Sequence, residues 1–241
     1  MSAPLAVVTG GSRGIGAAIC RRLAADGWDV VVGYRRDEAA AEHVADDVRA
    51  AGRRALAVRA DVTDEAEVEA LLVTAEGLGP VTGLVTSAGA ATAVGRLEDL
   101  PVAAIRADLE LDLLGTLLPI RAAIPRLRET GGAIVTISSG AATLGSPGEF
   151  VHYAAAKAGV DALTVGLSKE LAADGIRVNA VAPGLVVTDF HLDPGRPDRL
   201  APTVPMRRAG EPGEIAAAVS WLLSPDASYT TGAVLRVAGG R

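Results

Sequence analysis

The chain has 241 residues, of which 49% are hydrophobic and 22% are charged, and its net charge is −6. This composition is typical of a folded globular protein and excludes intrinsic disorder. The acidic balance and the 3% aromatic content offer neither a basic surface nor a stacking surface for nucleic acid. We therefore expect one globular domain over residues 1–241 that has no nucleic-acid partner.

The single cysteine, Cys20, excludes an intrachain disulfide and a multi-cysteine zinc site, and the histidines lack metal-site spacing. We expect no metal. No apolar run approaches the ~20 residues of a membrane span, and the first residues do not form a basic and then apolar signal segment. These features predict a cytoplasmic protein without a membrane partner.

Short β-branched runs alternate with long Ala- and Leu-rich stretches along the whole chain. The expected strands are 5–8, 29–32, 55–59, 83–86, 133–137, 177–182 and 233–237. The expected helices are 14–25, 37–50, 64–77, 101–128, 153–173 and 211–223. Because most strands are continuously apolar, they are expected to be parallel and covered on both faces. The pattern predicts an α/β fold with one doubly wound parallel sheet of about seven strands.

One stretch, 185–210, contains four prolines and no clear periodicity. It exceeds the ~12–15 residues that are usual for a loop without secondary structure. Such long loops are often functional, so we interpret this stretch as a substrate lid.

A glycine-rich turn directly follows the first expected strand and opens the first expected helix. Its sequence is Thr9-Gly10-Gly11-Ser12-Arg13-Gly14-Ile15-Gly16. Glycines at such a turn let the backbone approach a pyrophosphate, whose charge is stabilised at the helix N-terminus. A tight turn without a ligand is the alternative, but the strand–turn–helix context favours a nucleotide site.

The spacing of Gly10, Gly14 and Gly16 resembles the TGxxxGIG signature of the classical short-chain dehydrogenase/reductase superfamily. This resemblance implies a Rossmann fold and hydride transfer between a nicotinamide cofactor and a small carbonyl or alcohol substrate. The chain is similar to sugar-dehydrogenase-like and 3-oxoacyl-carrier-protein-reductase-like members. The resemblance also implies that Ser12 and Ile15 belong to the cofactor site.

The end of the second expected strand carries Tyr34, Arg35 and Arg36 where NAD-binding members of that family have an acidic residue. Guanidinium groups bind a 2′-phosphate well, whereas a carboxylate repels it. Arg13 resembles the basic residue that NADP-preferring members carry in the glycine turn. We therefore expect NADP(H) as the cofactor. The alternative is that these arginines are ordinary solvated charges.

Three further cofactor segments follow from the resemblance. Asp61-Val62 matches the pair that contacts the adenine, although Asp61 is also placed to cap the next helix. Ser87-Ala88-Gly89 follows the fourth strand where relatives have Asn-Ala-Gly. After the sixth strand, Pro183 and Gly184 match the turn at the nicotinamide. Val186 and Thr188 match positions that contact its carboxamide.

Tyr153 and Lys157 lie four residues apart on an expected helix, so both side chains share one face. A nearby ammonium favours the tyrosinate and thereby lowers the pKa of the phenol. In the family such a tyrosine is the acid–base, and the lysine also binds the cofactor. Ser139, at the end of the fifth strand, matches the serine that polarises the substrate carbonyl, and Ser138 is its structural neighbour.

The sequence departs from the family in the long helix 101–128. Alignment on Gly115 places Asp112 where relatives have a catalytic asparagine. An ionised carboxylate accepts hydrogen bonds but cannot donate one. We expect a tetrad of Asp112, Ser139, Tyr153 and Lys157, unless Asp112 faces solvent or a subunit contact.

Four aromatic residues lie where relatives line the substrate pocket, although packing or a solvated face is an equal alternative for each. They are Phe150, His152, Phe190 and His191.

The sequence predicts an NADP(H)-dependent oxidoreductase that reduces a ketone or an aldehyde or oxidises an alcohol. The alternative is a catalytically silent NADP-binding sensor or scaffold, which the substitution at Asp112 favours. Stretches 101–128 and 153–173 carry more apolar positions than one core-facing stripe requires. We therefore expect a homotetramer or a homodimer.

Overall fold

A computed structural model of the chain describes residues 3–241 and contains a sheet of seven strands in the order β3-β2-β1-β4-β5-β6-β7. Every neighbouring pair of strands is parallel. The strands are β1 (Leu5–Thr9), β2 (Asp29–Tyr34), β3 (Ala55–Arg59), β4 (Val81–Thr86), β5 (Gly132–Ile137), β6 (Ile176–Pro183) and β7 (Val234–Val237).

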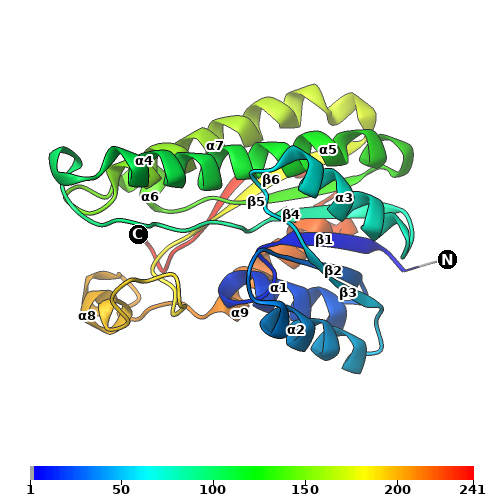
Figure 1. Cartoon of the computed structure of the whole chain (residues 1–241), viewed down its shortest axis with the longest axis horizontal. Coiled ribbons are helices and arrows are strands. Elements are labelled where there is room, and N and C mark those ends of the chain that lie inside the picture. Colours follow the sequence, from blue (N-terminus) through cyan, green and yellow to red (C-terminus); the bar gives the residue numbers. More distant parts are fainter. Residues whose placement is uncertain (1–2) are drawn as a thin grey trace.

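Helices cover both faces of the sheet (Figure 1). One layer contains α1 (Gly14–Ala25), α2 (Glu38–Ala50) and α9 (Pro212–Leu223). The other contains α3 (Glu65–Glu76), α4 (Val102–Leu109), α5 (Gly115–Thr130) and α7 (Val151–Glu170). Two short helices, α6 (Ala141–Leu144) and α8 (Arg196–Leu200), lie toward the carboxyl ends of the strands.

Strand β1 shows why the strands are continuously apolar. Ala6 and Val8 point into the core beneath α1, α2 and α9, whereas Leu5 and Val7 point into the core on the opposite face. All four side chains are almost completely buried because helices cover both faces. The predicted doubly wound parallel sheet is confirmed.

The strand order reverses at β1, which pairs with β2 on one side and β4 on the other. Crossovers leave the sheet in opposite directions at this point, so a crevice opens at the carboxyl ends of β1 and β4. Thr9 joins the two strand ends, because its hydroxyl oxygen accepts hydrogen bonds from the backbone N–H groups of Ser87 (3.2 Å) and Ala88 (3.4 Å). The glycine-rich turn begins at this crevice.

Two expected elements differ from the structure. The expected helix 101–128 is divided into α4, a five-residue π-helical turn (Glu110–Leu114) and α5. Stretch 185–210 is not structureless, because it contains α8 and a 3-10 turn (Ala201–Thr203). Pro197 sits in the first turn of α8, where the fixed φ of proline suits a helix start. Prolines thus begin short helices in this stretch.

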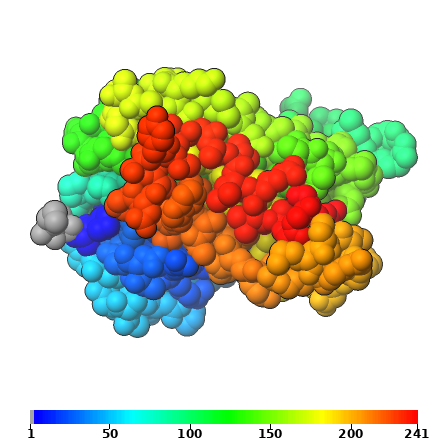
Figure 2. All heavy atoms as spheres, turned by 180° about the vertical axis from the view of Figure 1, so that it is seen from behind, coloured from blue at the N-terminus to red at the C-terminus, as the bar shows by residue number. Residues whose placement is uncertain are grey.

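The segment around α8 forms one corner of the molecule, next to the C-terminal residues (Figure 2). The backbone N–H of Met206 donates a hydrogen bond of 3.1 Å to the carbonyl of Gly239 and so joins the end of this segment to the residues after β7. Among residues 3–241, no helix combines the length and apolar character that crossing a bilayer requires.

Candidate active site

The fold brings the predicted site residues to the carboxyl edge of the sheet. Ser87 follows β4, Ser139 follows β5, and Pro183 ends β6. Helix α7 runs beside these strand ends and carries Tyr153 and Lys157, which are both buried. Residues distant in the sequence therefore meet around one helix face.

The Lys157 ammonium lies at the centre of this group. Its Nζ donates a hydrogen bond of 3.0 Å to the carbonyl of Ile137 at the end of β5, and it lies 5.6 Å from the centroid of the Tyr153 ring. Burial lowers the pKa of Lys157, but the nearby Asp112 carboxylate and Tyr153 reverse the direction, so the net shift is upward. Lys157 is therefore a fixed positive charge beside the phenol.

Tyr153 is placed to exchange a proton under the control of these neighbours. Burial raises the pKa of the phenol, the Lys157 ammonium lowers it, and Asp112 raises it again. The Ser139 side chain also lowers the pKa. Lys157 lowers the pKa of Tyr153, as the sequence predicted. Burial and Asp112 raise this pKa by a larger amount, so the net shift is upward. Tyr153 is therefore held as a proton donor at neutral pH.

Asp112 faces the site rather than solvent. Its side chain is fully buried, and Oδ1 lies 3.2 Å from the Lys157 Nζ. Within residues 3–241, neither carboxylate oxygen makes a well-aligned hydrogen bond, so the contact with Lys157 is an ion pair. Burial raises the pKa of Asp112, and Lys157 opposes this shift. A side chain at Gly89 would place its Cβ 2.6 Å from Oδ1, so the glycine leaves room for the carboxylate.

A second buried pair, which the sequence did not reveal, lies next to the first. Asp108 is fully buried and accepts hydrogen bonds from the His152 Nε2 (2.8 Å) and the Thr92 backbone N–H (3.0 Å). His152 thus packs between α4 and α7 instead of lining the pocket. The only signal in the sequence is that Asp108 precedes Asp112 by four residues, about one helical turn.

The glycine-rich turn forms a cradle of backbone groups. Gly10 and Gly14 have φ angles of +65° and +54°, which favour glycine. A Cβ on Gly10 would lie 2.8 Å from the backbone of Ala88, and one on Gly16 would lie 2.1 Å from the Gly10 carbonyl oxygen. The turn, which also contains Ser12 and Ile15, leads into the N-terminus of α1, where no side chain caps the backbone N–H groups. These residues fit a pyrophosphate.

The end of β2 carries the residues expected to read the adenosine half of a dinucleotide. Tyr34 is buried, whereas Arg35 and Arg36 are exposed, as is Arg13 in the glycine turn. Arg35 Nη1 lies 3.4 Å from Asp61 Oδ2, which places a guanidinium and a carboxylate at the same strand edge. Both side chains are partly exposed at this edge.

Asp61 does not cap α3. Its Oδ1 accepts hydrogen bonds from the backbone N–H (3.0 Å) and hydroxyl (2.8 Å) of Thr63. Asp64 is the cap, as its oxygen accepts from the N–H groups of Ala66 and Glu67. Val62 is buried.

The segment after β6 faces the glycine turn. A Cβ on Gly184 would lie 2.7 Å from Ala238 Cα, so only glycine allows the two backbones to approach this closely. Val186 is buried and pairs with Gly210 in an isolated bridge. The Thr188 side chain is 3.6 Å from the point where a Cβ on Gly14 would lie. Thr188 therefore lies across the crevice from the cradle.

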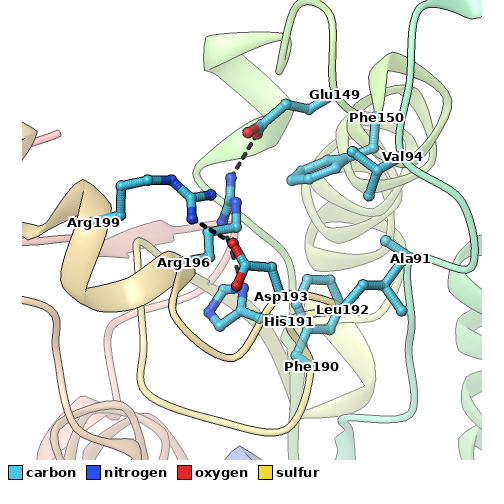
Figure 3. A pocket seen from close by; sticks show the side chains of 10 residues that line it. All are labelled: Ala91, Val94, Glu149, Phe150, Phe190, His191, Leu192, Asp193, Arg196 and Arg199. Carbon is cyan, nitrogen blue, oxygen red and sulfur yellow. Dashed lines mark hydrogen bonds and ion pairs between the residues drawn. The ribbon is translucent and has the colours of Figure 1, made fainter.

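A cavity of about 250 Å³ has Phe150 and Phe190 in its wall (Figure 3). Phe150 and Phe190 contact the Tyr153 ring, with ring centroids 5.6 Å and 5.5 Å away. The cavity is lined by Ala91, Val94, Glu149, Phe150, Phe190, His191, Leu192, Asp193, Arg196 and Arg199. The sequence indicated Phe150, Phe190 and His191 but not the charged residues, which come from two separate segments.

Comparisons with known proteins agree with this geometry. A family model described as enoyl-(acyl carrier protein) reductase matches residues 10–241. An uncharacterized oxidoreductase of Escherichia coli K12, YgfF, is 43% identical over 98% of this chain and 99% of its own length. The cis-4-hydroxycyclohexanecarboxylate dehydrogenase of Sinomonas cyclohexanicum is 44% identical over 98% of this chain and 95% of its own length.

The fold also matches solved structures. A short-chain dehydrogenase from Burkholderia cenocepacia, crystallised in complex with NADP, superposes with a TM-score of 0.92. It is 36% identical, and the match covers 98% of this chain and 97% of that chain.

Proposed function

This chain belongs to the short-chain dehydrogenase/reductase family and is an oxidoreductase of carbonyl and alcohol substrates; from this premise we propose that it is NADP(H)-dependent and that Ser139, Tyr153 and Lys157 carry the reaction. The observation that carries the proposal is the buried Tyr153 beside the Lys157 ammonium. We further propose that residues 1–241 act as one catalytic domain with 185–210 as its lid.

A dinucleotide held by the glycine turn at Gly10–Gly16 and by the backbone at Pro183–Gly184 would supply the hydride for the carbonyl carbon in the reductive direction. Tyr153 donates its phenolic proton to the carbonyl oxygen as the C=O double bond becomes a single bond. The Ser139 hydroxyl donates a hydrogen bond to the same oxygen and fixes it near the phenol. Lys157 stabilises the resulting tyrosinate, because its positive charge lies 5.6 Å from the ring. In alcohol oxidation the same proton moves in the opposite direction.

The alternative, a silent NADP-binding sensor or scaffold, would not need an acid–base tyrosine. A screen of ketones, aldehydes and alcohols with NADPH and NADP⁺ tests the two proposals. We expect turnover of at least one substrate, and Tyr153→Phe should lower kcat at least ~100-fold, because general acid–base catalysis typically contributes this much. Tyr229→Phe is the control, because Tyr229 is fully exposed. Wild-type turnover by Tyr153→Phe would remove Tyr153 from the reaction.

The cofactor preference depends on Arg35. Charge-assisted hydrogen bonds to a 2′-phosphate contribute ~1.5–3 kcal/mol each, so NADPH should bind at least about tenfold more tightly than NADH. Arg35→Ala should abolish most of this preference, because it removes the guanidinium and leaves the Asp61 carboxylate without its partner. Fluorescence titration with both cofactors measures the effect. The control, Arg128→Ala, removes an arginine that pairs with Asp174 instead. An unchanged preference in Arg35→Ala would refute this role.

Asp112 should tune the oxidation direction, which requires tyrosinate. Because the Asp112 carboxylate raises the pKa of Tyr153, Asp112→Asn should move the limb on which oxidation becomes faster with rising pH, as Tyr153 deprotonates, to lower pH. Tyr153 and Asp161 also raise the pKa of Lys157. Reduction near neutral pH should change little. Superimposable profiles of the two proteins would show that Asp112 does not act on Tyr153.

We expect a homodimer or a homotetramer, because the surface of α4 and α5 exposes several large apolar side chains. Val102 is 65% exposed, and Leu109, Leu114 and Leu117 are each more than one third exposed. Such residues typically mark an interface between symmetric copies. Light scattering at micromolar concentration should give a mass of at least twice the 24.3 kDa chain. A monomer would contradict the expectation.

A further inference from the structure

The cavity beside Tyr153 determines what part of a substrate can be bound next to the reacting carbon, so the following inference rests on the proposed function. Phe150 and Phe190 line the cavity, and both contact the Tyr153 ring. The cavity is about 250 Å³, which is smaller than the ~300–1,000 Å³ of sites for drug-sized ligands. A ring of about six members fits within this volume.

The two sides of the cavity differ in polarity. Figure 3 shows Phe150, Phe190 and Val94 on one side and the charged side chains on the other. The aromatic faces bind apolar C–H surface of a ring. The opposite side offers both hydrogen-bond donors and hydrogen-bond acceptors, so it suits groups such as hydroxyls that do both.

The charged side of the cavity is electrically balanced. Arg196 pairs with Glu149 at 2.6 Å and lies over the Phe150 ring, 5.2 Å from its centroid, and Arg199 pairs with Asp193. Each guanidinium therefore has a carboxylate partner within the cavity wall. The two pairs sum to zero charge.

His191 adds no charge at neutral pH. Its Nε2–H donates a hydrogen bond of 2.8 Å to the carbonyl of Val186, which leaves Nδ1 as an acceptor 3.5 Å from an Arg196 nitrogen. Burial, together with the positive charge of Arg196, holds the pKa of His191 below its usual value of 6.5. The ring is neutral at pH 7 and acts as a hydrogen-bonding group.

A charged substrate would enter this cavity without a free counter-ion. A carboxylate near Arg196 would also meet Glu149, and an ammonium near Glu149 would also meet Arg196. Desolvating a charge without a new partner is costly, whereas a hydroxyl keeps its hydrogen bonds. We propose that the substrate is an electrically neutral ring of about six members, a cyclic ketone or secondary alcohol, with hydroxyl groups on the side away from the reacting carbon.

This class differs from the carboxylate named for the Sinomonas relative. The test therefore uses three alcohols that share one ring and differ in charge at C4: 1,4-cyclohexanediol, 4-hydroxycyclohexanecarboxylate and 4-aminocyclohexanol. Oxidation of the cis and trans isomers of each is measured at pH 8 with NADP⁺ and with NAD⁺. We expect kcat/KM for the neutral diol to exceed that for either charged alcohol at least tenfold.

Binding is measured separately from turnover. Each alcohol is titrated calorimetrically into the wild-type protein that already holds NADPH, a combination in which no oxidation occurs. The diol should bind at least tenfold more tightly than the anion and the cation. A preference for the diol in binding without turnover of any alcohol would overturn the proposed function but leave the assigned ligand class standing.

Two variants test whether the charge balance causes the preference. Glu149→Gln leaves Arg196 without its carboxylate, so affinity for the anion relative to the diol should rise at least tenfold. Arg196→Gln should instead favour the cation. The control is Asp174→Asn, which removes an acidic partner of Arg128 outside the cavity and should leave the order unchanged.

Three results would overturn the inference. The first is that the wild-type protein binds a charged alcohol as tightly as the diol. The second is that none of the three alcohols binds. The third is that Glu149→Gln and Arg196→Gln leave the order of the three affinities unchanged. Turnover of a charged alcohol in preference to the diol would overturn the substrate class while supporting the proposed oxidoreductase.

Discussion

The buried Lys157 ammonium is the constraint on which the rest of the site depends. An ammonium without water is tolerated only when polar or charged groups replace its hydration. The Ile137 carbonyl accepts one of its hydrogens because β5 ends at this residue, and Asp112 supplies the opposite charge. The lysine therefore joins the central sheet to two helices. Tyr153 lies one turn away on α7 and experiences the net field of these groups.

This constraint gives the π-helical turn a physical role. Asp112 lies inside the five-residue turn Glu110–Leu114, and π-helical turns often occur at functional sites because they redirect a side chain. Four residues earlier, Asp108 binds His152, so α4 and the turn contact α7 through two successive carboxylates. Asp108 also accepts the Thr92 backbone N–H and thereby fixes the loop after β4. The loop, the turn and α7 are thus joined by two neighbouring buried polar contacts.

The sheet was predictable because local sequence patterns specify its strands. The ion pairs between residues distant in the sequence were not predictable. Seven β-branched runs gave the strands to within about two residues, and the glycine spacing placed the cradle. Tyr153 and Lys157 were identifiable because a helix fixes their relation. The π-helical turn changes one turn of an otherwise continuous helical pattern, so periodicity missed it. Glu149 and Arg196 are 47 residues apart, and nothing local in the sequence indicates that they pair.

The charges around Lys157 and the charges in the cavity wall are arranged differently. Around Lys157 a carboxylate, a phenol and an ammonium are buried together, so a change in the charge of one alters the pKa of the others. In the cavity wall the ion pairs are partly exposed, and each carboxylate already has its guanidinium. Phe150 and Phe190 both line the cavity and contact the Tyr153 ring, so these two aromatic residues link the paired charges of the wall to the coupled charges around Lys157.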